Sequence, residues 1–405
     1  MHAIPAPRTL TEWRSFAGAH QFDAVFLLYL AALAFSFFFL DTQWQRNLFY
    51  LGLPLCLWAG VKYPLRTLSA PAAVLVTGLA AYLLINAASI GWSSEVMGLE
   101  KFIQRSKMLL ILPLFLFGFL SFLLRYSWAW DVMIRAFVAG AFLSAPLLIL
   151  FNLDHIIDGS RLNGWGKAEN RVQCGVLYGL ALLLAIANLS PIQGFFRSIR
   201  WQPLVASCAV CAIIALPFFL SYSRGPILAV AAVCGAIALL KGITDRRWLI
   251  PLGFVAATGI VILLLNDSIL ERGSNGRMQV WDQAVDLFMA KPWFGHGIAS
   301  KFYYKIISVN GAPGIISHPH SIYLSALVHT GIAGLAVLLG SLLSGLYFAK
   351  RALCAGQASY FILIAFGAVL GFLDYGGYYT NFGGTWLVYW LPMAALSAYM
   401  QERRA

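Results

Sequence analysis

The sequence has few charged residues for its length. Asp, Glu, Lys and Arg make up 11% of its 405 residues, whereas hydrophobic residues make up 60%. A water-soluble domain cannot cover itself with so little polar surface, which excludes an ordinary soluble globular protein. The composition therefore predicts a membrane protein.

Cysteine and the common cofactor-binding motifs are also scarce or absent. The chain has six cysteines, and the redox-like pair Cys208 and Cys211 lies inside an apolar run, where side-chain packing is the favoured interpretation. The remaining cysteines show no disulfide framework. Because the sequence also lacks a phosphate loop, a dinucleotide fingerprint and any nucleic-acid module, neither a nucleotide cofactor nor a nucleic-acid partner is expected.

Apolar runs long enough to cross a bilayer as helices recur along the whole chain. They predict an all-α polytopic membrane protein that forms one transmembrane domain over residues 1–405, with about twelve spans. The expected spans are 23–40, 47–61, 72–91, 108–124, 132–153, 173–189, 202–219, 225–240, 248–266, 320–348, 358–374 and 383–400. The first 22 residues lack the pattern of a cleaved leader, and the capping box from Thr9 to Glu12 predicts a short surface helix.

The distribution of basic residues predicts the orientation of these spans. Lys62 with Arg66, Lys241 with Arg246, and Lys350 with Arg351 all fall on one side of the membrane. The positive-inside rule assigns that side, together with both termini, to the cytoplasm.

The opposite, outer side has two long loops, near residues 267–319 and 154–172. Residues 277–289 have amphipathic helical spacing, and 298–308 is a second candidate interfacial helix. This side also retains cations that the orientation rule does not explain: Arg161, Lys167, Arg171, Arg224, Arg277, Lys291, Lys301 and Lys305.

Three of these arginines are candidates for binding an anion. Arg224 lies in SYSRG (221–225) at the outer membrane boundary, where an arginine can either snorkel to lipid headgroups or face a ligand. Its planar guanidinium suits two-pronged phosphate binding. Arg161, in a loop rich in glycine and asparagine, and Arg277 would complete one positive site if the spans bring them together.

His320 stands at the mouth of a long apolar segment, after His318 and Pro319, with Pro319 expected in the first helical position. A histidine at a span end is as often a satisfied interfacial group as a catalyst. An imidazole there can nevertheless accept a proton near neutral pH while the arginines hold a leaving phosphate. This combination suits transfer from a lipid-linked pyrophosphate donor.

These motifs resemble the bacterial O-antigen ligase family, within the wider group of O-antigen ligases and polymerases. The resemblance covers most of the chain and rests on SYSRG, on Arg277-x3-Trp281 followed by KPWFGHG, and on His320-Ser321-x9-Gly331. In the loop that carries Arg161, Glu169 stands before Asn170 where the family pattern has proline.

The resemblance implies a fold similar to that of the all-helical (GT-C type) glycosyltransferases that use lipid donors. It implies an inverting, metal-independent enzyme that transfers O-antigen polysaccharide from undecaprenyl pyrophosphate to a sugar hydroxyl of lipid A-core on the periplasmic face. His320 would be the general base, and Arg161, Arg224 and Arg277 would bind the pyrophosphate. Further candidates for substrate contact are Ser221, Ser223, Asn170, Lys167, Ser321 and His318.

Other interpretations remain open from the sequence. An O-antigen polymerase would use the same donor, a protein O-oligosaccharyltransferase is usually longer, and a transporter or flippase would carry ionisable groups near mid-membrane. Two carboxylate pairs, Asp154 with Asp158 and Asp282 with Asp286, have helical spacing that could serve a metal ion, although surface roles are favoured and no metal or other cofactor is expected. The roles of His296 and His329 are left undecided.

Overall fold

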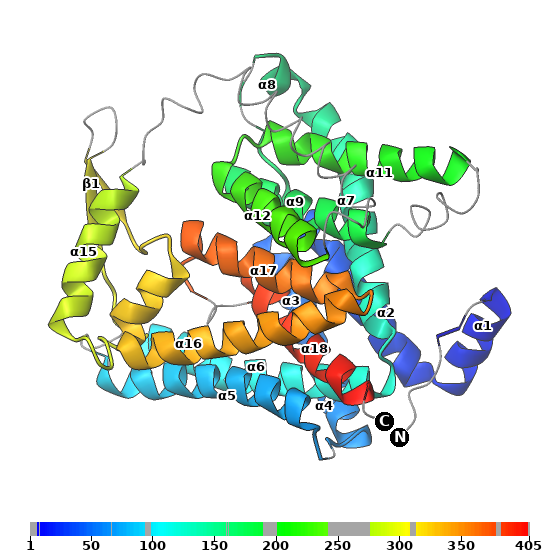
Figure 1. Ribbon diagram of the computed structural model, residues 1–405, viewed down its shortest axis with the longest axis horizontal. Coiled ribbons are helices and arrows are strands. Elements are labelled where there is room, and N and C mark those ends of the chain that lie inside the picture. The colour runs from blue at the N-terminus through cyan, green and yellow to red at the C-terminus, as the bar shows by residue number, and fades with distance from the viewer. Residues whose placement is uncertain are drawn as a thin grey trace.

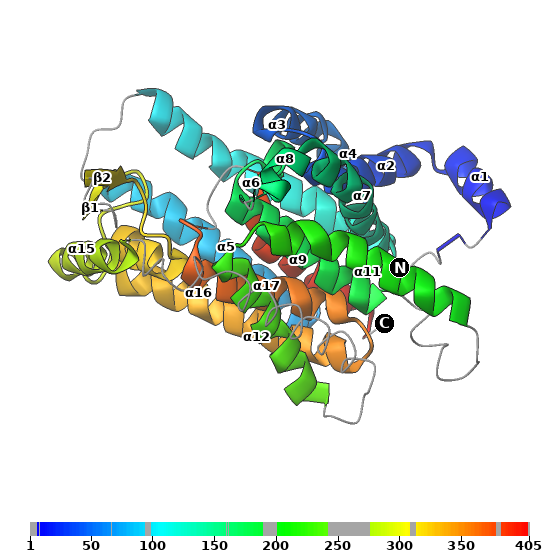
Figure 2. The same ribbon diagram turned by 90° about the horizontal axis from the view of Figure 1, so that it is seen from above.

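A computed structural model describes residues 6–7, 9–65, 67–93, 99–158, 160, 162–188, 201–241, 276–307, 313–377 and 382–403. These residues form mostly helices, with one two-stranded sheet (Figures 1 and 2). The elements in the first half of the chain are α1 (Leu10–Ala19), α2 (Gln21–Phe35), η1 (Ser36–Phe38), α3 (Thr42–Leu51), α4 (Leu53–Lys62), α5 (Ala70–Ser89), η2 (Ile90–Trp92), α6 (Leu99–Arg125), α7 (Ala129–Phe151), α8 (Leu153–Ile157), η3 (Gly166–Ala168) and α9 (Arg171–Asn188). The second half contains α11 (Trp201–Leu220), α12 (Arg224–Lys241), α15 (Arg277–Ala290), β1 (Tyr304–Ile307), β2 (Pro313–Ile316), α16 (Ile322–Cys354), α17 (Ala358–Leu373), the π-helical turn η5 (Trp386–Trp390) and α18 (Leu391–Glu402).

The described helices confirm a mostly helical membrane protein. Five segments are long and apolar enough to cross a bilayer: Gln21–Phe38, Ala70–Trp92, Ala129–Phe151, Arg224–Lys241 and Ile322–Cys354. Four shorter apolar segments, Leu110–Arg125, Arg171–Ala187, Cys208–Leu220 and Ala358–Leu373, coincide with further expected spans. The helix predicted from the capping box is present as α1, in which Thr9 and Glu12 exchange the reciprocal hydrogen bonds of that motif.

Some expected spans take another form. The expected span 47–61 is divided between α3 and α4 at Gly52, where the Tyr29 ring packs so closely that no side chain fits. Pro54 follows in the first turn of α4, as suits the start of a new helix. The last expected span begins with the turn η5, and 248–266 lies outside the described residues.

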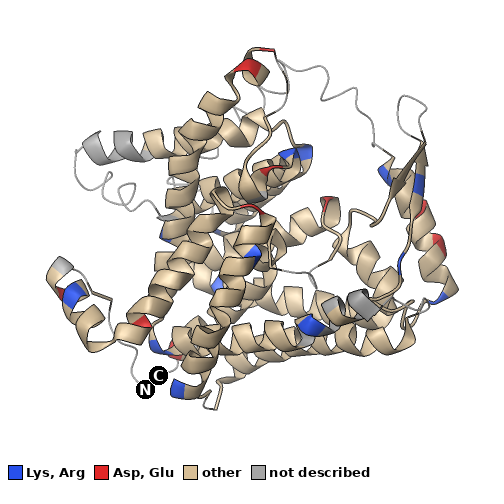
Figure 3. Ribbon diagram, turned by 180° about the vertical axis from the view of Figure 1, so that it is seen from behind, with Lys and Arg blue, Asp and Glu red and all other residues tan. Residues whose placement is uncertain are grey.

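The helices meet at two opposite ends, which we name the terminal end and the site end. At the terminal end, Lys62 Nζ at the end of α4 and Tyr126 Oη beyond α6 both donate to Asp23 Oδ2 on α2. Ser69 N donates to Gln401 Oε1 at 2.6 Å, which joins the start of α5 to α18. Both chain ends lie on this side, away from α15 and the β-strands (Figures 1 and 2). Charged residues are sparse along the helices and are found mainly near helix ends and on α15 and its neighbouring strands (Figure 3).

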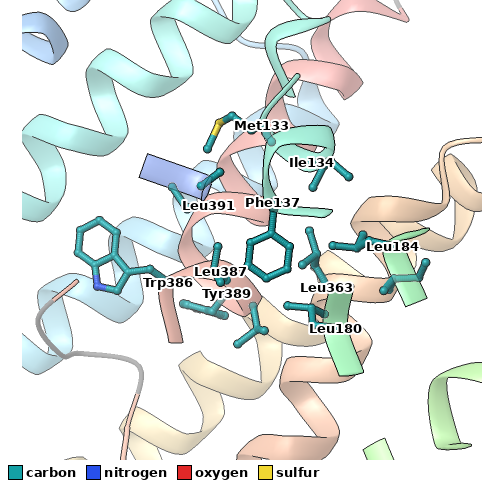
Figure 4. Close-up of a cluster of buried hydrophobic side chains, with 14 of the residues drawn as sticks. Met133, Ile134, Phe137, Leu180, Leu184, Leu363, Trp386, Leu387, Tyr389 and Leu391 are labelled. Atoms are coloured by element: carbon teal, nitrogen blue, oxygen red, sulfur yellow. The ribbon is translucent and has the colours of Figure 1, made fainter. Parts of the chain in front are cut away.

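A dense apolar core holds the bundle together where α7, α9, α17 and η5 meet (Figure 4). Phe137 of α7, Leu180 of α9 and Trp386 of η5 are all almost completely buried there. Large, close-packed side chains of this kind give rigidity to the frame from which the site end projects.

The loop before α16 contains one of the two expected helices. The expectation for 277–289 is confirmed as α15, although Val280 and Ala284 form its buried stripe, whereas Met278 and Val285 are exposed. The buried stripe of α15 packs on Tyr304 of β1, so this helix covers one side of the strand.

The expectation of a helix over 298–308 is wrong. Residues 304–307 instead pair antiparallel with 313–316, with Tyr304 opposite Ile316. The β-branched isoleucines of both segments favour this strand pairing. Gln283 of α15 pairs with the main chain of Lys305, with bonds of 2.7 and 3.0 Å, and Gln279 accepts from Ile307 N. These contacts provide hydrogen-bond partners for the main-chain groups at the edge of β1 that does not pair with β2.

Candidate functional site

His320 lies just before α16, in a main-chain conformation that few residues adopt. Its φ is +50°, in the left-handed region, and α16 begins two residues later at Ile322. The expectation that Pro319 occupies the first helical position is therefore wrong. Ser321 caps the helix instead by accepting a hydrogen bond from Leu324 N at 3.5 Å, and it is buried. Left-handed conformations at residues other than glycine are strained and tend to occur at functional sites.

Asp374 at the end of α17 joins His320 to Arg277. Its Oδ1 lies 3.3 Å from His320 Nδ1 and 3.8 Å from an Arg277 guanidinium nitrogen. All three side chains remain partly exposed, at 13% for Asp374, 29% for His320 and 35% for Arg277. A carboxylate in this position orients the imidazole and leaves Nε2 to face the surroundings.

Sequence reasoning did not identify Asp374. The available signal was an acidic residue directly after an apolar span, which is unfavourable in a membrane and is usually functional. Its partner His320 is 54 residues away, so no local pattern links the two residues.

His318 packs against the same centre. Its ring lies 4.2 Å from the His320 ring between centroids, and its Nδ1 accepts a hydrogen bond from His320 N at 3.3 Å. Burial lowers the pKa of His318, the neighbouring His320 lowers it further, and Asp374 acts in the opposite direction. His318 therefore favours its neutral form, and with Nδ1 engaged by His320 N it can offer Nε2 to a polar ligand.

The SYSRG segment lies at the same end of the bundle. Tyr222 is the second residue other than glycine, among those described, with a left-handed φ, at +48°. Arg224 begins α12, and a Cβ added to Gly225 would lie 3.7 Å from Leu373 Cβ, one residue before Asp374. The fold thus brings the start of α12 beside the end of α17.

The two serines of this segment shape the turn. Ser221 is completely buried and donates to Phe218 O at 2.7 Å. Ser223 donates to Arg171 O at 3.0 Å and so joins the turn to the start of α9. Both hydroxyls therefore have main-chain partners, which indicates a structural contribution to the position of Arg224.

The loop before α9 is partly described. Asn170 Oδ1 accepts from Val172 N at 2.9 Å, in the manner of a residue that caps a helix, and Arg171 Nε donates to Asn163 Oδ1. Arg161 and the side chain of Lys167 lie outside the described residues. The pairing of Leu162 N with Leu220 O at 3.0 Å nonetheless brings this loop to the end of α11, beside SYSRG.

The KPWFGHG segment, Lys291–Gly297, clasps a break in α16. Gly331 has φ +67° and ψ −164°, which interrupts the helix and exposes its main-chain groups. The segment pairs with those groups through His296 N to Val328 O, Gly297 N to His329 O and Ile332 N to Pro292 O, with lengths of 2.8–2.9 Å. A Cβ at Gly331 would lie 2.4 Å from Trp293 C, so the close approach requires glycine.

Two histidines strengthen this clasp. His296 Nε2 contacts Leu287 O of α15 at 2.8 Å, and His329 Nδ1 contacts Gly297 O at 2.9 Å. Trp281 Nε1 of α15 also donates to Pro319 O at 3.0 Å. The clasp and this bond together hold α15, which begins with Arg277, against the segment that carries His320.

Within the described part of the chain, no three His, Cys, Asp or Glu side chains gather as they would to hold a metal ion. The pairs Asp154 with Asp158 and Asp282 with Asp286 are exposed on α8 and its end, and on α15.

Comparisons with known proteins agree with the motifs in this site. Residues 209–339, which include Arg224, Arg277 and His320, match the family model described as O-antigen ligase. The chain is 25% identical over 249 residues to an O-antigen ligase of Pseudomonas aeruginosa (strain PAO1). The match covers 60% of this chain and 59% of that relative, so it spans somewhat more than half of each. Over these residues the chain is similar to the O-antigen ligase family.

Proposed function

We propose that this protein transfers O-antigen polysaccharide from undecaprenyl pyrophosphate to a sugar hydroxyl of lipid A-core at the periplasmic face of the bacterial inner membrane. The observation that carries the proposal is the contact of Asp374 with both His320 and Arg277 at the end of the bundle away from both termini. The similarity to the O-antigen ligase family supports a glycosyl-transferring activity. The placement of both termini in the cytoplasm rests on the distribution of basic residues.

His320 is the general base in this proposal. Asp374 holds Nδ1, so Nε2 accepts the proton of the attacking sugar hydroxyl as its oxygen bonds to the anomeric carbon of the donor. The bond from that carbon to the pyrophosphate oxygen breaks in the same displacement, and the configuration of the anomeric carbon inverts. The proton ends on the imidazole, and the electron pair leaves with the pyrophosphate.

The arginines stabilise the charge that develops on the leaving group. Arg277 lies close enough to the His320 centre to contact a pyrophosphate held there, and Arg224 begins the helix beside Asp374. Arg161 belongs to the loop that approaches SYSRG, and we include it as a third phosphate ligand. Preorganised cations of this kind can perform the electrostatic task that a divalent metal performs elsewhere, so we propose a reaction without a metal.

The direct test is reconstitution of the purified protein in liposomes with the lipid-linked glycan and lipid A-core, in the presence of a chelator. We expect a ladder of lipopolysaccharide on a gel, with the newly formed bond inverted relative to the donor. Glycan chains that lengthen on the undecaprenyl carrier, without transfer to lipid A-core, would instead identify a polymerase. Donor that crosses the bilayer without transfer would identify a flippase and contradict the proposal.

A further inference from the structure

A cavity of about 470 Å³ opens beside the histidine pair. Its walls come from α5, the segment from Ile298 to Tyr304, the His318 loop, α16 and the two glycines after α17. The volume is within the usual range of small-molecule sites, about 300–1,000 Å³. His318 forms part of the wall, whereas Asp374, Arg277 and Arg224 do not.

The chemistry of the walls suits a carbohydrate. Aromatic rings alternate with uncharged hydrogen-bonding groups in the set Tyr82, Asn86, Phe302, Tyr303, Ser317 and Ser325. Aromatic faces pack against the C–H faces of a sugar ring, and amide or hydroxyl groups pair with its hydroxyls. Asn86 is almost fully buried and donates its amide NH2 to Tyr82 O at 2.7 Å, which fixes its Oδ1 for a donor from a ligand.

One charged side chain lies in the wall. Lys301 is exposed, and among the described lining residues there is no carboxylate. One cation without a carboxylate beside it suits a sugar that carries an anionic group, such as a phosphate or a carboxylate.

The position of the cavity distinguishes the acceptor from the donor. In an inverting displacement the attacking hydroxyl approaches the anomeric carbon from the side opposite the leaving pyrophosphate. The arginines lie on the Asp374 side of the histidine pair, and the cavity adjoins the pair through His318, whose ring lies 4.2 Å from that of His320. A sugar in the cavity therefore reaches His320 without displacing the pyrophosphate.

We infer that this cavity binds an anionic sugar of the acceptor, with Lys301 and Ser317 as specificity-determining residues. The inference rests on the proposed function, and it assigns the cavity to the acceptor sugar. Donor binding at the arginines is expected to be independent of it.

Two variants and two matched controls test the inference. Lys301→Ala removes the cation, and Lys305→Ala removes an exposed lysine of β1 that lies outside the cavity. Ser317→Trp places a bulky ring in the cavity wall, and Ile315→Trp places the same ring at a position that is 72% exposed and outside the cavity. Lys301, Lys305 and Ser317 are polar and exposed. Ile315 is apolar and exposed, so none of the four positions lies in the buried core.

The first measurement is the binding of delipidated core oligosaccharide to the full-length protein in detergent, without donor. We expect about 2- to 5-fold weaker binding for Lys301→Ala, as for loss of one exposed ion pair. We expect about 10- to 100-fold weaker binding for Ser317→Trp, because the indole overfills the cavity. The controls should bind as the wild type does. Enzymatic removal of phosphate from the oligosaccharide should abolish the difference between Lys301→Ala and wild type when the anion is a phosphate, and should preserve it when the anion is a sugar carboxylate.

Kinetics in liposomes provide the second measurement. The two cavity variants should raise the KM for lipid A-core and leave the KM for the lipid-linked donor unchanged. A rise in the donor KM alone, or unchanged oligosaccharide binding in both cavity variants, would overturn the inference while leaving the ligase proposal intact. If wild type binds the oligosaccharide with the expected variant pattern but transfers nothing to lipid A-core, the inferred site stands and the proposed reaction fails.

Discussion

Each end of the helical bundle holds an aspartate beside a histidine, and the two aspartates are satisfied to different extents. At the terminal end, Asp23 is fully buried. Its carboxylate accepts hydrogen bonds from Tyr63, Tyr126 and Lys62 at 2.8–3.2 Å, and His20 Nδ1 lies 3.5 Å from it. At the site end, Asp374 is 13% exposed, and its contacts with His320 and Arg277 are 3.3 and 3.8 Å long.

This difference distinguishes a carboxylate that joins helices from the one that we propose acts in the site. The partners of Asp23 occupy both of its oxygens, so it fastens α2 to the ends of α4 and α6 and has no capacity for a ligand. Asp374 has longer contacts and access to solvent, so the Arg277 guanidinium can move from it to a phosphate that enters the site. The terminal end therefore supplies matched controls for His320, Arg277 and Asp374.

Replacement of the histidines should give the largest contrast. We expect His320→Ala to lower the transfer rate by about 10²- to 10⁴-fold, the usual contribution of a general base. His20→Ala removes the corresponding histidine at the terminal end and should leave the rate per folded molecule unchanged. Initial rates in liposomes measure both, and equal rates for the two variants would contradict the assignment of His320.

Replacement of the basic partners should give the next contrast. Arg277→Ala should lower transfer by about 10²- to 10³-fold, as for loss of one preorganised contact to developing charge. Arg277→Lys should recover little of this, because an ammonium cannot bind phosphate with two parallel bonds. Lys62→Ala, the control, should retain transfer, and an active Arg277→Ala variant would show that the leaving group is held elsewhere.

The aspartates should separate activity from stability. Asp374→Asn should lower transfer by about 10²-fold, less than the ~10⁴-fold known for a tightly held imidazole, since the contact here is 3.3 Å long. The pH profile of the rate should shift with it, which a purely structural role would not cause. Asp23→Asn should instead lower the free energy of unfolding by about 1–3 kcal/mol, because charge-assisted hydrogen bonds are lost. Thermal unfolding in detergent and the rate assay measure the two effects. The prediction fails if Asp374→Asn mainly loses stability or if Asp23→Asn mainly loses activity per folded molecule.

The clasp at the break in α16 can be tested with two glycines of one helix. Gly331→Ala would place a Cβ 2.4 Å from Trp293 C, in a conformation nearly confined to glycine. We expect a strain of about 1–3 kcal/mol and a fall in transfer on the order of 10-fold, because α15 would shift relative to His320. A Cβ at Gly340 meets no atom within 4 Å among the described residues, so Gly340→Ala should be neutral in both assays.

The smallest expected effect concerns His318 and pH. Its pKa is lowered, mainly by burial, so the native state disfavours its protonated form. This contribution to stability is fully present above the unfolded pKa of about 6.5 and is lost as the pH falls through the lowered native value. The melting temperature of wild type should therefore fall more steeply below pH 6.5 than that of His318→Gln. His155→Gln, at an exposed position, should follow wild type, and parallel curves for all three would exclude the effect.

Local sequence patterns determined much of this protein. The scarcity of charge and the apolar runs predicted a helical membrane protein, and the spacing from Arg277 to Met289 predicted α15. Both properties depend on neighbouring residues, because a helix satisfies its hydrogen bonds within itself and its periodicity is local. The same motifs indicated His320, Arg224 and Arg277 before their arrangement was known.

Tertiary structure alone decided how these residues meet. It joined Asp374 to His320 across 54 residues, turned 304–307 into a strand paired with 313–316, and placed the KPWFGHG segment in the break at Gly331. It also formed the cavity beside His318 from segments between Tyr82 and Gly377. Such contacts depend on the packing of distant helices, which no window of neighbouring residues encodes.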